Sequence, residues 1–239
     1  MSKPLMCWPN INSRKSDMLF DPNNKNLPFN PFKALVAPRP IGWLTTISDS
    51  GVINLAPYSY FQAVADNPDI VMFSAAPQLQ VNEEGMQFLD TGKDSQTNAE
   101  TSGEFVCNMV SMDLVNEMNE SSAHHPANVS EAELIGIEMA ESTHVKPPRV
   151  AAAPAAIECV VVDTYTVQHR GGKHRYTMTF GEVLGIHIKD EFVHNGRVDT
   201  AAMALVTRMG YDEYAVLEKA FSLSRPDNDP LLSGMLTSR

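Results

Sequence analysis

Short apolar runs rich in β-branched residues, separated by turn residues, dominate the chain from residue 35 onward. Ile41–Ser48 and Val52–Ala56 are typical of the two arms of a β-hairpin, because Asp49-Ser50-Gly51 between them supplies turn residues. Asp69–Ser74 predicts a third strand after Pro68. The same pattern predicts later strands at Glu104–Val110, Ile157–Val167 and Arg175–Ile188.

Helical spacing is confined to short segments between these strands. Lys93–Thr101 predicts a short helix, with Ser95 or Asp94 as its N-terminal cap and Gly103 at its C-terminal break. Less regular segments are Tyr58–Phe61 with Ala63–Ala65, predicted as a helical turn or tight loop, and Ala75–Asp90, predicted as an irregular surface excursion. Further helical segments are predicted at Met112–Glu120, Glu131–Ile135, Asp199–Met209 and Tyr211–Leu217.

About six or seven antiparallel strands with short helices between them predict a mainly β domain, either a barrel or a sandwich. The periodicity does not distinguish these two architectures. The chain of 239 residues is long enough to bury a sizeable core in one large domain. We expect residues 35–220 to form that domain, residues 1–34 to be a strap that packs on the body or on a second subunit, and residues 221–239 to be a flexible or partner-bound tail.

Charge and composition narrow the classes of partner. The formal net charge of −11 argues against sequence-independent binding of nucleic acid, which requires a basic face, although it leaves room for an anionic cofactor held by local donors. No apolar run approaches the ~20 residues that span a bilayer, and the first residues lack a secretory h-region, so we expect the chain to stay in the cytoplasm. Cys7, Cys107 and Cys159 show no C-x-x-C pairing and fit reduced thiols.

Two stretches carry candidate chemistry. At the start of the predicted helix, Lys93 supplies a cation, Ser95 a hydroxyl and the helix end unpaired N–H groups, which together suit a phosphate. Asn98 falls on the same face of that helix as Ser95. The alternative is an ordinary capped surface helix. Around Trp43, Tyr58 and Tyr60, small and hydroxylic residues could form a shelf for a flat, polar-edged ligand, or simply a barrel corner: Thr45, Thr46, Ala56 and Ser59.

Other catalytic motifs are absent from the sequence. No G-x-G-x-x-G follows a strand and opens a helix, which argues against a Rossmann dinucleotide site. The seven histidines have no H-E-x-x-H or H-x-H spacing, so we expect no metal site. No G-x-S-x-G elbow supports a serine hydrolase.

Several segments, in order, resemble one known family. The run Pro38-Arg39-Pro40-Ile41-Gly42-Trp43, followed by Asn54-Leu55-Ala56-Pro57-Tyr58-Ser59-Tyr60-Phe61, is similar to the flavin reductase-like family of FMN-binding split β-barrel proteins. The same order continues with Lys93-Asp94-Ser95 and Asn98, Pro148-Arg149-Val150 leading to Glu158-Cys159, and Gly181-Glu182-Val183 leading to His187. In the family the residue at Ser95 is usually threonine, so the hydroxyl is kept.

The resemblance implies a split β-barrel, that is, an antiparallel Greek-key barrel, with FMN as cofactor and NADH or NADPH as a transient electron donor. It also implies a homodimer with the flavin at the subunit interface. Arg39 is implied as a phosphate or interface ligand. The full set of implied flavin-binding residues is Arg39, Trp43, Thr45, Thr46, Asn54, Ala56, Pro57, Tyr58, Ser59, Ser74, Lys93, Ser95 and Asn98.

We therefore expect an NAD(P)H-dependent flavin reductase, passing hydride to FMN or through bound FMN to an acceptor such as a monooxygenase partner. His174 and His187 are candidate catalytic residues. Gly172-Lys173-His174 departs from the Gly-Asp-His segment of many reductases, because lysine replaces the acid and the histidine lies further from Gly181. That departure keeps an alternative open, an FMN-binding electron carrier without its own nicotinamide site. The related pyridoxamine-phosphate oxidase barrels are a further alternative on fold grounds.

Overall fold

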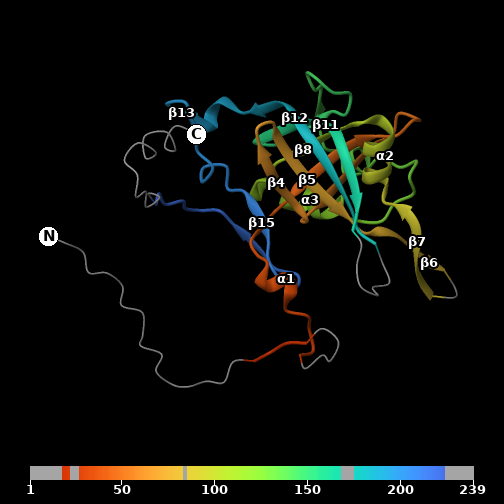
Figure 1. The fold of residues 1–239 in the computed structure, drawn as a ribbon. Helices are drawn as coiled ribbons and strands as arrows, with labels where there is room; N and C mark the ends of the chain where they lie inside the picture. The colour runs from red at the N-terminus through yellow and green to blue at the C-terminus, as the bar shows by residue number, and fades with distance from the viewer. Residues whose placement is uncertain (1–17, 22–26, 83–84, 168–174, 224–239) are drawn as a thin grey trace.

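A seven-stranded antiparallel sheet forms the body of the computed structural model, which describes residues 18–21, 27–82, 85–167 and 175–223 (Figure 1). Its strand order is β3-β2-β8-β11-β12-β5-β4. The expected mainly β, antiparallel architecture is confirmed, and six strands begin and end within two residues of their predicted bounds. These strands are β2 (Gly42–Ile47), β3 (Ile53–Tyr58), β5 (Asp69–Ala75), β8 (Glu104–Asn108), β11 (Ala155–Thr166) and β12 (Thr177–Ile188).

The helical turn predicted after Pro57 is wrong. This segment is a seventh strand, β4 (Phe61–Asp66), which pairs with β5 at the edge of the sheet. Phe61 lies opposite Phe73 and is buried, while the rest of β4 is exposed. An edge strand whose residues beyond Phe61 are exposed on both faces accepts small and polar residues, which is why its composition is unlike that of a buried strand.

Two apolar clusters lie on opposite sides of β2, whose residues are almost all buried. Trp43 joins an outer cluster with Leu55, Met118 and Val150, whereas Leu44 joins an inner cluster. Neighbouring residues of a strand point to opposite faces, so both faces of β2 are covered. In the inner cluster the ring centroids of Phe73 and Phe105 lie 5.4 Å apart, and those of Tyr58 and Phe73 lie 5.2 Å apart.

Gly181 allows the inner cluster to close. A Cβ atom at this position would lie 2.3 Å from Cζ of Phe105 and 3.0 Å from Cβ of Cys159. Glycine is therefore required where β12 crosses the Phe105 ring. Cys159 and Cys107 are both buried free thiols in this cluster, in agreement with the prediction of reduced thiols in strands.

A β-hairpin occupies the segment predicted as an irregular excursion, so that prediction is wrong. Its arms are β6 (Pro77–Asn82) and β7 (Gly85–Gly92), which among the described strands pair only with each other and project from the body (Figure 1). The chain passes from β7 into α2 (Asp94–Ser102), which lies against β2 and ends at Gly103 with a φ of 74°. The helix and its glycine end confirm the prediction.

The remaining helices are short. The predicted helical segments at 112–120 and 131–135 are confirmed, and a polar loop joins them. Their bounds, with those of two further helices, are α1 (Phe32–Leu35), η1 (Met112–Leu114), α3 (Val115–Glu120), α4 (Glu131–Leu134) and η2 (Asp190–Phe192).

The predicted helices at 199–209 and 211–217 are wrong. Ala204 and Tyr211 adopt positive φ angles of 47° and 52°, which a right-handed helix does not accept. This segment instead forms β15 (Val206–Arg208) and β16 (Tyr214–Val216), paired in a three-stranded sheet with β1 (Arg39–Pro40). Two further pairs join β9 (Met139–Ala140) to β10 (Arg149–Val150) and β13 (Val193–His194) to β14 (Arg197–Val198).

The predicted strap and tail lie largely outside the described residues, which contain 18–21 and 27–34 of the strap and 221–223 of the tail. Among the described helices, none is long and apolar enough to cross a membrane.

Candidate functional site

A cavity of about 270 Å³ opens beside the N-terminus of α2. We call it the Lys93 cavity. It brings together six of the residues predicted to bind a cofactor, although they come from two separate parts of the sequence: Asn54, Ala56, Pro57, Tyr58, Lys93 and Ser95. Its other lining residues are Gln78, Leu79, Asp94, Ser121, Ser122, Ala123, His124, His125 and Glu131.

The start of α2 presents donors to this cavity. Lys93, and neither Ser95 nor Asp94 as predicted, is the N-cap residue, and its side chain makes no capping hydrogen bond. The first N–H groups of the helix therefore have no side-chain acceptor at the cap, and the positive end of the helix dipole faces the opening. Burial lowers the pKa of the Lys93 ammonium and raises the pKa of the Asp94 carboxyl. Both shifts show a partly dehydrated site, where an anionic ligand would favour the charged form of Lys93.

A hydrogen-bond network connects four of the predicted residues. Asn54 Oδ1 accepts from Ser95 Oγ at 2.6 Å and from Thr46 Oγ1 at 3.4 Å. Asn98 Nδ2 donates to Thr46 Oγ1 at 3.2 Å. β2, β3 and α2 are thus tied together at the cavity, which orients Asn54 and Ser95 in its wall.

Glu131, which sequence reasoning did not select, anchors the other end of this network. Its Oε2 atom accepts from Asn54 Nδ2 and from the Leu55 backbone N–H, each at 3.0 Å. The side chain is buried because α4 packs on β3. The local sequence assigns a role only to Glu133, since Ser130-x-x-Glu133 is a capping-box pattern and Ser130 Oγ accepts from Glu133 N. The enclosure of Glu131 follows from tertiary packing.

Tyr58 forms a largely apolar part of the wall. Burial raises the pKa of its hydroxyl to about 12, although a hydrogen bond with Ser95 acts in the opposite direction. The phenol therefore stays protonated at neutral pH and can donate a hydrogen bond.

The structure places the other predicted residues outside the lining of this cavity. Arg39 is buried and donates to the backbone carbonyls of Lys33, Val36 and Met209, the last at 2.7 Å. Trp43 Nε1 donates to Ser121 Oγ at 2.8 Å, and Thr45 Oγ1 accepts from Asn108 Nδ2 at 2.8 Å. Ser59 lies between β3 and β4 and Ser74 lies in β5, and both are half-buried. Trp43 reaches the cavity indirectly, because Ser121 is one of its lining residues.

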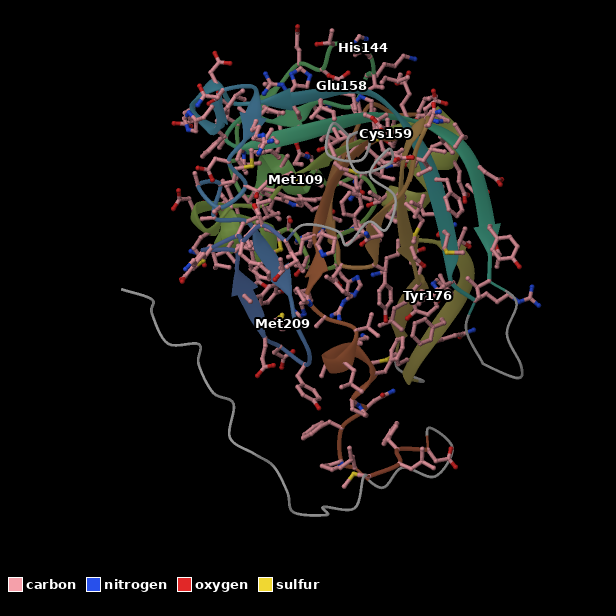
Figure 2. The ribbon with its side chains drawn as sticks, turned by 60° about the vertical axis from the view of Figure 1, so that its left-hand side comes forward. Met109, His144, Glu158, Cys159, Tyr176 and Met209 are labelled. Carbon is pink, nitrogen blue, oxygen red and sulfur yellow. The ribbon has the colours of Figure 1, made fainter. Side chains whose placement is uncertain are left out.

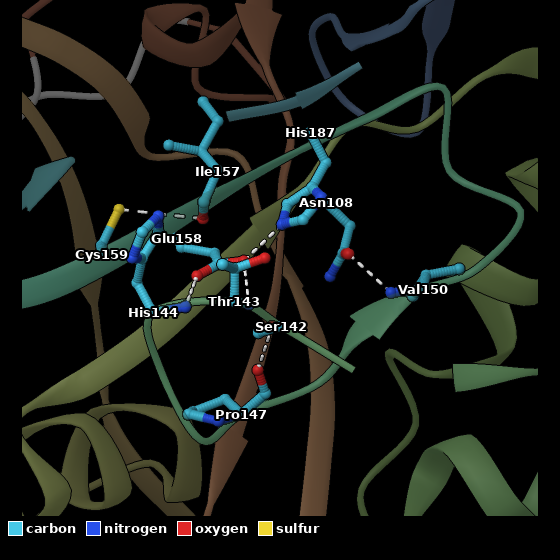
Figure 3. Close-up of polar contacts among 10 residues, drawn as sticks. All are labelled: Asn108, Ser142, Thr143, His144, Pro147, Val150, Ile157, Glu158, Cys159 and His187. Carbon is cyan, nitrogen blue, oxygen red and sulfur yellow. Dashed lines mark hydrogen bonds and ion pairs between the residues drawn. The ribbon is translucent and has the colours of Figure 1, made fainter. Parts of the chain in front are cut away.

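His187, a candidate catalytic residue, belongs to a different cluster. Its Nε2 atom contacts Glu158 Oε1, and the Glu158 carboxylate also accepts from Thr143 N at 2.7 Å and His144 N at 2.5 Å (Figure 3). Burial alone would raise the pKa of Glu158, but the hydrogen bonds from Thr143, His187 and His144 hold it below its ordinary value. Figure 2 shows His144 and Glu158 close together, well separated from Met209 and Tyr176 in that view.

The second candidate, His174, lies outside the described residues. Within the part of the chain that the structure describes, no three His, Cys, Asp or Glu side chains gather in a way that could hold a metal ion.

Comparison with known proteins identifies the family. The model of the flavin reductase like domain matches residues 35–203. An uncharacterized protein of Deinococcus radiodurans is 37% identical over 200 residues, which cover 80% of this chain and 82% of the relative. The chain therefore belongs to the flavin reductase-like family.

Solved structures agree with this assignment. The nitrilotriacetate monooxygenase component B from Bacillus cereus is 28% identical, with a TM-score of 0.76 over 87% of this chain and all (100%) of that chain. A flavin reductase-type protein with a split barrel domain from Shewanella frigidimarina NCIMB 400 is 19% identical, with a TM-score of 0.66 over 82% of this chain and 90% of that chain, which speaks for the fold. The chain has the split β-barrel fold, as the resemblance implied.

Proposed function

We propose that this protein binds FMN, with the phosphate end in the Lys93 cavity, and acts as an NAD(P)H-dependent flavin reductase. The observation that carries the proposal is the convergence of Lys93, the α2 N-terminus and the Asn54–Ser95 pair on one cavity in a chain of the flavin reductase-like family. Lys93 forms no ion pair with any described residue, so its charge is available to an anion. These groups fit a phosphate.

In this proposal each residue has a definite part. Lys93 and the first N–H groups of α2 bind the phosphate, while Ser95 and Asn54 orient the chain that leads from it. Ala56, Pro57 and Tyr58 provide a wall for the flat ring and exclude water from it. FMN, when bound, supplies a ring that accepts two electrons and a proton from a reduced nicotinamide and delivers them to an acceptor. The protein's contribution is to hold donor and ring in contact.

A homodimer with the flavin at the subunit interface is part of the proposal. Its support is the number of large apolar side chains that one subunit leaves exposed on the barrel and hairpin, including Met86 at 70%, Ile186 at 54% and Leu184 at 43%. The likeness to a monooxygenase component B further favours an oxygenase as the acceptor of reduced flavin.

The electron-carrier alternative rests on the altered Gly172-Lys173-His174 segment. A spectrum of the purified full chain followed by anaerobic titration separates the two functions. A yellow protein that NADH or NADPH bleaches rapidly supports the reductase. Bleaching by dithionite alone favours the carrier, and a colourless protein that shows no FMN uptake in calorimetry contradicts both.

A variant of Lys93 tests the assignment of the cavity. We expect Lys93→Met to weaken FMN binding by about 10- to 100-fold, because it removes a charge-assisted hydrogen bond worth roughly 1.5–3 kcal/mol. Lys146→Met is the matched control, since Lys146 is exposed and does not line the cavity. Equal affinities of the two variants for FMN would place the phosphate elsewhere.

A further inference from the structure

A second cavity, of about 450 Å³, lies where β11 begins and β12 ends. We call it the Arg149 cavity. It shares no lining residue with the Lys93 cavity. Two of its lining residues, Arg149 and Lys189, carry a positive charge. Most of its apolar lining comes from the first residues of β11 and the last residues of β12. The residues that matter here are Arg149, Pro154, Ile186, His187, Lys189 and Asp190.

Arg149 is the distinctive group in this cavity. It is half-buried, and among the described residues its guanidinium makes no ion pair and no hydrogen bond. Its Nε atom is fully buried and has no hydrogen-bond partner. A buried N–H without an acceptor costs about 1–3 kcal/mol, and more for a charged group, so such donors in folded proteins almost always meet an acceptor. The Nε atom lies too deep for a ligand, but the two terminal guanidinium nitrogens are not among the fully buried atoms and meet no described acceptor, so they are the donors that a molecule in the cavity can reach.

The neighbouring charges favour an anion at this position. Lys189 Nζ donates to the Ala152 carbonyl at 2.9 Å and, within the described residues, forms no ion pair. Asp190 is the acidic residue of the lining, and it pairs with neither cation. Glu158, enclosed next to the cavity, already accepts hydrogen bonds from Thr143, His144 and His187 (Figure 3).

His187 completes the wall in a fixed orientation. The lowered pKa of Glu158 keeps that residue a carboxylate, so the hydrogen bond between them requires a proton on His187 Nε2. The imidazole is 30% exposed, which leaves its other edge toward solvent. Ile186, which is half exposed, supplies apolar surface beside it, whereas Pro154 is buried and closes the wall behind.

We propose that the Arg149 cavity is a second binding site, for a small organic molecule that carries one oxyanion on an apolar body. The oxyanion, a carboxylate or a phosphate monoester, accepts from the Arg149 guanidinium in the bidentate manner that planar arginine favours. The apolar body packs on Ile186. The site is independent of the proposed FMN site, since neither needs a residue of the other.

Titration of the full-length, isotope-labelled protein with three aromatic probes tests this site by NMR. The probes are benzoate, phenyl phosphate and the neutral benzyl alcohol, and the readout is the backbone amide shifts of residues 149–156 and 186–190. We expect saturable shifts in these segments with one or both anions and at least about tenfold weaker binding of benzyl alcohol. The stronger of the two anions identifies the headgroup class. Shifts that centre on residues 93–98, equal binding of the neutral probe, or no shift at all would overturn the proposal.

Two variants and a control sharpen the result. Arg149→Met removes the charge and should weaken anion binding at least about tenfold, whereas Arg149→Lys keeps a charge and should retain part of it. Arg197→Met is the control, because Arg197 is exposed on the β13–β14 hairpin and does not line the cavity. Equal losses in the Arg149→Met and Arg197→Met variants would contradict the assignment. If Arg149→Met fails to fold, the comparison of Arg149→Lys with the wild-type chain still decides the case.

Discussion

Two buried carboxylates, Glu131 and Glu158, lie in different parts of this barrel and differ in the hydrogen bonds that they accept. Each is 6% exposed or less, and each accepts backbone N–H groups. Glu131 uses one oxygen, Oε2, for both of its described hydrogen bonds. Glu158 uses both oxygens, with Oε1 serving Thr143 and His187 and Oε2 serving His144.

This difference indicates that Glu131 supports the wall of a binding cavity, whereas Glu158 stabilises the fold. Glu131 lines the Lys93 cavity and has one oxygen, Oε1, without a described donor, so that oxygen can accept a hydrogen bond from a ligand. Glu158 is 0% exposed and joins three parts of the chain, because its partners come from the 143–144 loop and from β12 while it belongs to β11. Both oxygens of Glu158 accept hydrogen bonds, so a neutral amide, which has one acceptor oxygen, cannot replace it.

Glu158→Gln should produce the largest effect. The new amide nitrogen must face a backbone N–H or the histidine that the carboxylate now accepts from, and the charge that attracts them is lost. We expect a loss of about 3 kcal/mol in the free energy of unfolding. The midpoint temperature of thermal unfolding should fall by roughly 6–12 °C for a domain of this size. A change within about 1 kcal/mol would mean that Glu158 does not hold these segments together.

Acidification should produce an intermediate effect with a defined sign. The folded-state pKa of Glu158 lies below its ordinary value of 4.5, so the stabilisation from this group is present above that value and is lost as pH falls through the lowered folded pKa. Denaturant unfolding of the wild-type chain and of Glu158→Gln should therefore converge as pH falls below 4.5. A constant difference between the two curves down to acid unfolding would contradict the shift.

Glu131→Gln should produce the smallest effect. The amide oxygen of glutamine can replace Oε2 and keep both hydrogen bonds, with the new NH₂ group at the position that lacks a described donor. We expect a loss of about 1 kcal/mol or less in chemical denaturation, measured beside Glu158→Gln under the same conditions. Equal losses in the two variants would remove the distinction drawn between the carboxylates.

The central strands could be predicted because their own residues determine them. β2, β5, β8, β11 and β12 are β-branched or apolar runs bounded by turn residues, and burial on the sheet agrees with that preference. The bounds of α2 could also be predicted to within one residue, since a cation and a hydroxyl occur at the start of the helical segment and Gly103 ends it, although the N-cap is Lys93 and not Ser95 or Asp94. The helix end and its phosphate-type donors are local features that need no distant partner.

The other elements depend on pairing that the local sequence does not contain. β15 has helical spacing of apolar residues, yet it pairs with β1 from the opposite end of the chain. The β6–β7 hairpin depends on cross-strand pairs, with Leu79 opposite Phe88 and Val81 opposite Met86 on one face. The sequence does not show that Glu131 and Glu158 are buried or that Arg149 lacks an ion pair, because only the closed barrel determines which charges are buried and which remain unpaired.

Arg39 has a practical consequence for anyone who shortens this chain. Its guanidinium holds carbonyl groups of Lys33 and Val36 on one side and of Met209, 170 residues later, on the other. Gly210 permits the contact, since a Cβ atom there would lie 2.5 Å from Cβ of Ala34. A shortened chain for crystallisation should begin before Lys33 and end after Gly210. A chain that lacks either segment leaves the buried Arg39 guanidinium without carbonyl acceptors.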